Sequence, residues 1–159
     1  MATSRQLMAA VLAMGLSASP AAPQSNVPLE VIGPDGQTSV MTRSEIEALP
    51  QSEILTTTIW TDGTIRFSGV PMARLLEHAG AEGTVLIMTA LNDYSIEMPM
   101  GDLEADAPIV ATRMNGQPMS VRDKGPYWVV YPFDDHPKYQ TETTHARSVW
   151  QLARISVIE

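Results

Sequence analysis

The sequence predicts an α+β fold that is mostly β, with mixed sheets and two or three short helices. Short runs rich in valine, isoleucine, threonine and aromatic residues recur along the chain, and such runs favour strands. Turn sequences built on glycine, proline and asparagine separate these runs, and one stretch, residues 71–79, has clear helical spacing of its apolar residues. The chain has 159 residues, of which 44% are hydrophobic, so it can bury the core of one domain.

The N-terminal segment, residues 1–21, has the pattern of a secretory signal peptide. Arg5 precedes an apolar run over residues 7–16, and the small residues Ser19 and Ala21 suit a cleavage site. The run is too short for a permanent membrane span. We therefore expect residues 22–159 to form a single exported, periplasmic domain with no stable membrane anchor after cleavage. The alternative is a disordered or membrane-tethered N-terminus.

Net charge and cysteine content exclude several kinds of function. Eighteen acidic residues against ten basic ones leave a net charge of −8, which repels phosphate backbones and argues against a nucleic-acid partner. The chain has no cysteine, so it forms no disulfide, thiol nucleophile or thiolate metal site. Its stability in an oxidising compartment must come from packing.

The first half of the chain predicts two hairpins and a short helix. A Gly-Pro-Asp-Gly turn joins strands at residues 29–32 and 37–41. Thr42 and Glu45 have capping-box spacing and Pro50 limits the helix that follows, which we expect over residues 42–49. A two-residue turn, Asp62-Gly63, is expected to join strands at residues 53–61 and 64–68.

The second half begins with the clearest helix of the sequence. Pro71 suits its first position and Gly80 its C-terminal end, and its apolar residues fall on one face. The elements expected after it are strands at 84–90 and 94–99, a helical turn at 102–105, strands at 109–114 and 117–121 around Asn115-Gly116, a strand buried on both faces at 127–131, a polar stretch at 134–144, a helical turn near 148–152 and a last strand at 155–158.

Five motifs, in this order, resemble the sulfite-oxidase-like molybdopterin-binding domain. They are Phe67-Ser68-Gly69-Val70-Pro71 with Leu75-Leu76 and Gly80; Asn92-Asp93-Tyr94; Met114-Asn115-Gly116-Gln117-Pro118-Met119; Gly125-Pro126 with Val129-Val130-Tyr131-Pro132; and Ser148-Val149 with Ile155 and Val157. The matches extend from about Glu53 to Val157. The resemblance implies the fold of that family first, since fold is inherited more reliably than chemistry, and it implies molybdopterin as a possible cofactor.

Three departures from the family pattern argue against its redox chemistry. The resemblance implies a cysteine ligand for molybdenum at a strand end, where this chain has Thr57 or Thr58, and a neutral hydroxyl is a poor substitute for a soft thiolate. An arginine and a lysine that help hold the pterin phosphate in the relatives fall at Trp128 and Trp150. Their loss removes charge-assisted hydrogen bonds of roughly 1.5–3 kcal/mol each.

The candidate pocket combines these positions with other polar residues of the motifs. Its candidate residues are Thr57, Thr58, Asn92, Asp93, Tyr94, Asn115, Lys124, Trp128 and Trp150. An ordinary turn is the simpler interpretation of Asn92 and Asp93, and Lys124 is either the local cation for an anionic ligand or a surface lysine. Trp128 and Trp150 either fill the former cofactor space or turn it into an aromatic recess.

Other candidate chemistry is weaker. Asp134, Asp135, His136 and His145 could form a metal cluster, but their surroundings suit a solvated loop. Met98 and Met100 could bind copper, but alternating methionines in a strand also suit a core. We assign no catalytic residue and no metal ligand.

The sequence therefore predicts an exported module on a molybdopterin-binding scaffold, without molybdenum redox catalysis, that binds an unknown small ligand or a periplasmic protein partner. One alternative is a molybdopterin-dependent oxidoreductase with a non-cysteine metal environment. A second is an acidic periplasmic interaction protein.

Overall fold

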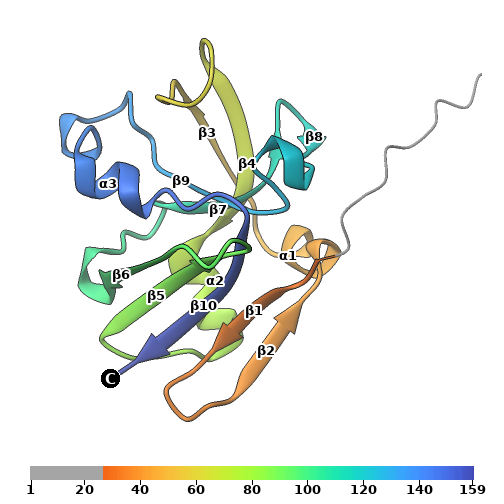
Figure 1. Ribbon diagram of the computed structural model, residues 1–159, viewed down its shortest axis with the longest axis vertical. Coiled ribbons are helices and arrows are strands. Elements are labelled where there is room, and N and C mark those ends of the chain that lie inside the picture. Colours follow the sequence, from red (N-terminus) through yellow and green to blue (C-terminus); the bar gives the residue numbers. More distant parts are fainter. Residues whose placement is uncertain (1–26) are drawn as a thin grey trace, which may run out of the picture.

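A computed structural model of the chain describes residues 27–159 (Figure 1). The predicted signal peptide lies outside these residues. The elements in chain order are β1 (Leu29–Ile32), β2 (Thr38–Met41), α1 (Arg43–Ala48), β3 (Ser52–Thr56), β4 (Ile65–Pro71), α2 (Met72–Ala79), β5 (Val85–Ala90), β6 (Ser95–Pro99), β7 (Ile109–Met114), β8 (Gln117–Pro118), β9 (Trp128–Val130), α3 (Glu142–Arg147) and β10 (Leu152–Ile158). Short 3-10 helices cover Met100–Asp102, Val121–Asp123 and Pro137–Tyr139. No helix within residues 27–159 is long and apolar enough to cross a membrane.

The strands form two sheets, which occupy the lower and upper halves of Figure 1. The lower sheet has the order β2-β1-β10-β5-β6, and its β1–β10 pair is parallel while the other pairs are antiparallel. The upper sheet has the order β3-β4-β7-β8, with β9 also paired to β7. The prediction of a mostly β fold with mixed sheets and short helices is confirmed.

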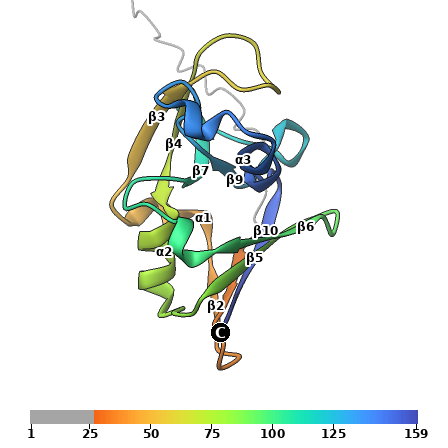
Figure 2. The same ribbon diagram turned by 90° about the vertical axis from the view of Figure 1, so that its left-hand side faces the viewer.

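Apolar residues between the elements form a large cluster and a smaller one. The large cluster includes the buried residues Met72, Leu75 and Leu76 of α2. Figure 2 shows this helix beside the lower sheet. The smaller cluster lies on the upper sheet and contains Phe67 and Trp128. The apolar run at 127–131 is buried throughout, as its composition predicts.

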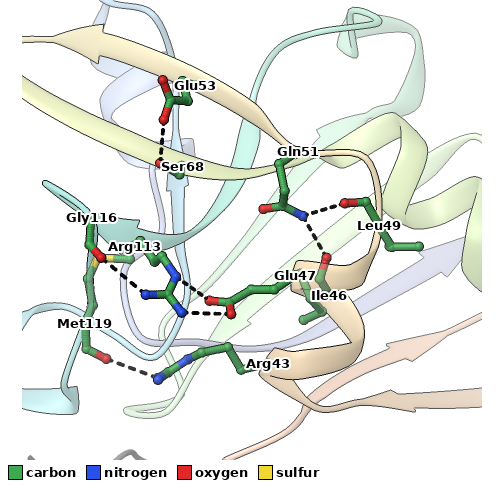
Figure 3. Close-up of polar contacts among 10 residues, drawn as sticks. All are labelled: Arg43, Ile46, Glu47, Leu49, Gln51, Glu53, Ser68, Arg113, Gly116 and Met119. Carbon is green, nitrogen blue, oxygen red and sulfur yellow. Dashed lines mark hydrogen bonds and ion pairs between the residues drawn. The ribbon is translucent and has the colours of Figure 1, made fainter.

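Helix α1 is tied to the β7–β8 hairpin by polar contacts (Figure 3). Its N-cap, Thr42, forms the predicted capping box with Glu45. Arg113 binds both carboxylate oxygens of Glu47 at 3.0 Å and donates to the Gly116 carbonyl oxygen at 3.2 Å. Arg43 donates to the Met119 carbonyl oxygen at 3.3 Å. The hairpin of the Met114–Met119 motif is therefore held against α1.

Gly69 allows strands β4 and β7 to approach closely. The pairing register of the two strands shifts between Ser68 and Gly69. A Cβ atom on Gly69 would overlap the carbonyl oxygen of Val110 and lie 2.6 Å from the Cα atom of Ala111. Because these are backbone atoms of a buried strand, they cannot move aside as a flexible side chain can. This contact explains physically why the Phe67–Pro71 motif has glycine at this position.

The β3–β4 connection is longer than predicted. β3 ends at Thr56 rather than at residue 61, and a loop over residues 57–64 replaces the expected two-residue turn. The strand ends there because Thr57 binds Asp134 instead of continuing the pairing with β4. The prediction followed the strand-favouring composition of the segment and missed this long-range contact.

The last helix also lies earlier than predicted. The helical turn expected near 148–152 is instead α3, which begins within the polar stretch expected at 134–144 and ends at Arg147. Thr141 caps α3, since its hydroxyl accepts from the Thr144 amide at 3.2 Å. β10 begins at Leu152, where it pairs with Ala90 of β5. The expected strand at 117–121 shortens to β8, and the expected turn at 102–105 forms at Met100–Asp102.

We expect Gly69→Ala to lower the free energy of unfolding by ~1–3 kcal/mol, because the added methyl group overpacks the β4–β7 contact. Gly101→Ala is the matched control, since a Cβ atom there has no neighbour within 4 Å. Urea denaturation of both variants measures the difference. Equal stability of the two variants would contradict the close approach of β7 to Gly69.

Candidate functional site

Trp60, on the loop between β3 and β4, lies at the centre of an aromatic cluster. Its ring centroid is 5.5 Å from that of Trp150 and 5.9 Å from that of Trp128. It is also 5.7 Å from the ring centroid of His145 and 6.4 Å from that of Phe133. All four contacts are edge-to-face, the arrangement that aromatic quadrupoles favour. Trp60 therefore joins three segments that are distant in sequence.

Trp128 forms the base of this cluster. Its side chain is fully buried, its indole N–H donates to the Ser148 carbonyl oxygen at 3.2 Å, and its ring lies 5.1 Å from that of Phe67. Trp128 and Trp150 also form an antiparallel backbone bridge. The structure thus places one of the two candidate tryptophans in the core and the other, Trp150, partly exposed above it.

Two pockets adjoin this cluster and share His145. The first, of about 270 Å³, is lined by Trp60, Ala90, Asn92, Tyr94, His145, Ala146, Ser148, Val149 and Trp150; we call it the indole pocket. The second, of about 300 Å³, is lined by Thr57, Thr58, Ile59, Phe133, Asp134, Gln140 and His145; we call it the threonine pocket.

The structure brings most of the candidate residues to these two pockets. Thr57 and Thr58 line the threonine pocket, and Asn92, Tyr94 and Trp150 line the indole pocket. The Nζ atom of Lys124 lies 4.4 Å from the ring centroid of Trp150 and 5.8 Å from that of Trp128, within the range of cation–π contacts.

Asp93 and Asn115 line neither of the two pockets. Both have positive φ, 66° and 50°, and both occupy tight turns. The Asp93 amide donates to the Ala90 carbonyl oxygen in the β5–β6 turn, and the Asn115 side-chain oxygen accepts from the Arg66 amide at 3.0 Å beside the β7–β8 turn. These two candidates therefore have local structural roles in the fold.

The end of β3 is held by Asp134, which follows β9. The Thr57 amide and hydroxyl donate to the two carboxylate oxygens of Asp134 at 2.6 and 2.7 Å. The Asp134 amide in turn donates to the hydroxyl of the buried Thr56 at 3.1 Å. Hydrogen bonds from the Thr57 hydroxyl and amide hold the pKa of the Asp134 carboxyl below its usual range.

The hydroxyl groups of the indole pocket already donate to the protein. The Tyr94 hydroxyl donates to the Ala146 carbonyl oxygen at 3.0 Å, and the Ser148 hydroxyl donates to the Thr144 carbonyl oxygen at 2.8 Å. The Asn92 side-chain oxygen accepts from the Tyr94 amide at 3.1 Å. Within residues 27–159, the imidazole nitrogens of His145 and the indole N–H groups of Trp60 and Trp150 have no hydrogen-bond partner.

The histidines and acidic residues of the 134–145 segment lie apart. His136 accepts from the Lys138 amide at 3.1 Å through Nδ1, whereas His145 packs between Trp60 and Phe133. In the part of the chain that the structure describes, no three histidine, aspartate or glutamate side chains gather as a metal site. Met98 is buried, and its sulfur accepts from the Tyr131 hydroxyl at 3.2 Å.

Sequence reasoning missed several pocket residues. Trp60 is only three residues from Thr57, so its position on the strand-end loop was the available signal. His145 and Ala146 fell between the predicted polar stretch and the predicted helical turn, because the last helix was predicted too late in the chain. Ala90 and Val149 carry no local signal, since small apolar residues are common in any core.

Comparisons with known proteins agree with this fold. A family model described as "Oxidoreductase molybdopterin binding domain" matches residues 17–133. The crystal structure of the sulfane dehydrogenase SoxCD from Paracoccus pantotrophus superposes with a TM-score of 0.63 at 16% sequence identity, covering 86% of this chain and 40% of that one. A search of curated protein sequences found no match.

The chain thus spans less than half the length of this structural relative, and at this identity the likeness shows the fold alone. The family match covers well over half of the chain and confirms the resemblance predicted from the five motifs. The chain belongs to the oxidoreductase molybdopterin-binding domain family.

Proposed function

We propose that this chain is an exported, non-redox member of its family that binds a small ligand at the pockets around Trp60. The observation that carries the proposal is the end of β3. There the family resemblance places the sulfur ligand of molybdenum, and this chain has Thr57 bound through two hydrogen bonds to Asp134.

The donor set at this strand end does not fit a molybdenum site. The chain has no cysteine, and the hydroxyl of Thr57 already donates to a carboxylate. A threonine hydroxyl stays protonated at neutral pH, so it supplies neither the charge nor the soft electron donation of a thiolate. The Asp134 carboxylate adds a negative charge, and its lowered pKa keeps that charge in place at neutral pH.

The positions of the phosphate-binding cations do not fit a pterin phosphate either. Trp128 is fully buried and its single donor is bound to the Ser148 carbonyl oxygen. Trp150 carries no charge, and the ammonium group of Lys124 lies over its ring. An anionic phosphate here would lose hydration without gaining the charge-assisted hydrogen bonds that normally compensate.

The pockets nevertheless leave room for a ligand. Concave, mostly apolar pockets with a few polar groups are the usual form of small-molecule sites, and the indole and threonine pockets share His145 between them. Loss of the metal ligand together with retention of a pocket supports binding without redox chemistry.

We expect the protein to contain far less than one molybdenum atom per chain when it is produced in a host that makes the molybdenum cofactor. Mass-spectrometric metal analysis and the fluorescence of oxidised pterin measure this on the purified full chain. A cysteine-containing family member, produced in parallel, is the control for cofactor supply. Stoichiometric molybdenum with bound pterin in this chain would refute the proposal.

Thr57→Cys and Thr58→Cys test whether the missing thiolate alone prevents molybdenum binding, or whether the loss of the phosphate-binding cations also prevents it. Because Trp128 and Trp150 still occupy the positions of the phosphate-binding cations, we expect both variants to remain free of molybdenum. Molybdenum in either one would mean that the thiolate alone is missing.

We expect Thr57→Val to make the stability of the protein less dependent on acid pH. In the wild type the lowered pKa of Asp134 contributes stability that is present above the usual carboxyl pKa and is lost as pH falls through the lowered value. The variant loses the hydroxyl hydrogen bond, so its Asp134 pKa rises. The difference in urea midpoint between wild type and variant should be present at pH 7 and shrink below about pH 4.

The control for this experiment is Thr61→Val, since the Thr61 hydroxyl bonds only another hydroxyl, that of Thr58. Its effect on the urea midpoint should not change over the same pH range. An unchanged Asp134 pKa in Thr57→Val, measured by carboxyl NMR titration, would contradict the assigned contact.

We expect export to depend on the N-terminal segment. In a Gram-negative host the full chain should be processed and recovered in the periplasmic fraction, while a variant with two aspartates in the apolar run, Leu12→Asp and Leu16→Asp, should stay unprocessed in the cytoplasm. Recovery of the unprocessed wild type in the cytoplasm would contradict the export part of the proposal.

A further inference from the structure

We infer that the ligand of the indole pocket is a neutral, flat aromatic molecule of about two fused rings. The inference rests on the proposed function, because it assumes that no metal cofactor occupies this space. It names the chemical class of the ligand from the size, wall chemistry and charge of the pocket.

The volume of the pocket sets the size of the ligand. An apolar cavity of about 150 Å³ is enough to bind benzene, and pockets for drug-sized ligands begin near 300 Å³. The indole pocket, at about 270 Å³, lies between these limits. It therefore has room for two fused rings with a small substituent.

The walls of the pocket favour an aromatic ligand. The lining includes the aromatic residues Trp60, Trp150 and Tyr94 and the small apolar residues Ala90, Ala146 and Val149. Aromatic rings pack edge-to-face or offset against one another, as Trp60 already does with Trp150. A planar aromatic ligand can form such contacts with the three aromatic lining residues, whereas a branched aliphatic ligand cannot.

The charges around the pocket favour a neutral ligand. None of its lining residues is an aspartate, glutamate, lysine or arginine. A cationic ligand would find no carboxylate in the lining, and the ring of Trp150 already has the ammonium group of Lys124 over it. An anionic ligand would find no lysine or arginine in the lining, since Lys124 lies over the ring of Trp150 and is not itself a lining residue. Either ion would lose its hydration without an opposite charge to compensate.

The polar groups of the pocket allow only a few hydrogen bonds to the ligand. The hydroxyls of Tyr94 and Ser148 donate to backbone carbonyls. Among the lining residues, the side-chain groups without a hydrogen-bond partner in residues 27–159 are the imidazole of His145, the indole N–H groups of Trp60 and Trp150, and the side-chain NH2 group of Asn92. A ligand with a few polar atoms at its edge matches this set better than a highly polar bicycle such as a pterin, because six of the nine lining residues are aromatic or aliphatic.

Calorimetric titration with four two-ring probes tests the chemical class. The probes are 2-naphthol, which is neutral; 2-naphthoate, an anion; N-methylquinolinium, a cation; and 6-methylpterin, a neutral but highly polar bicycle. We expect 2-naphthol to bind at least tenfold more tightly than each of the other three. No binding of 2-naphthol, or tighter binding of any other probe, would overturn the inference.

Ala146→Leu tests the location, because the larger side chain on α3 fills the indole pocket. We expect it to weaken 2-naphthol binding at least tenfold. Ala105→Leu is the matched control, since Ala105 is exposed and lines a different pocket. This variant should bind 2-naphthol with the affinity of the wild type. Equal affinity of both variants would overturn the assigned location.

NMR of the wild type provides a readout that does not depend on a variant folding. Addition of 2-naphthol should shift the indole N–H signals of Trp60 and Trp150, which have no protein partner. The signal of Trp128 should shift much less, because its N–H is buried and bound to the Ser148 carbonyl oxygen. Shifts confined to Trp128, or none at all, would overturn the inference.

Metal analysis of the same preparation distinguishes failure of the proposed function from failure of the assigned ligand class. Stoichiometric molybdenum would refute the proposed function itself. A molybdenum-free preparation that does not bind 2-naphthol would overturn only the assignment of the ligand class.

Discussion

Burial of Trp128 is the interaction on which the arrangement of the upper half of the molecule depends. The residue lies in β9, where its backbone pairs with β7 on one side and bridges to Trp150 on the other. Its ring contacts Phe67 of β4 and Trp60 of the β3–β4 loop, and its indole N–H is satisfied by the Ser148 carbonyl oxygen. One large side chain thus links a sheet, a loop and the segment after α3. A buried indole with a satisfied N–H is compatible with a well-packed core.

The same packing supports the proposal that this member of the family is not a redox enzyme. The resemblance implies cations at positions 128 and 150, and tryptophans there turn a charged region into an aromatic one. At the end of β3, the amide and hydroxyl of Thr57 both donate hydrogen bonds to the carboxylate of Asp134, so these two donors already have protein partners. Both changes support the proposal of a non-redox member of the family, and the two pockets that share His145 leave room for a ligand.

Short-range patterns predicted much of the fold, because the physical signal for each of these elements lies within a few residues. The capping box at Thr42 and the turn at Asn115-Gly116 are local in this sense. The errors occurred where a distant residue decides the local structure. Asp134, 77 positions after Thr57, ends β3 earlier than its composition predicts. Local patterns also placed the last helix after residue 147, whereas α3 ends at Arg147 and brings His145 and Ala146 to the pocket.

The sequence by itself determined the family, the mostly β architecture and the absence of a thiolate, since motif order, strand-forming runs and cysteine content are properties of the chain alone. Only the tertiary structure decided which candidate residues share a site. It separated Asp93 and Asn115 from the others by their roles in turns, and it placed Trp128 in the core and Trp150 at a pocket. The physical reason is that a pocket is formed by side chains from distant segments, and their meeting depends on how the two sheets pack.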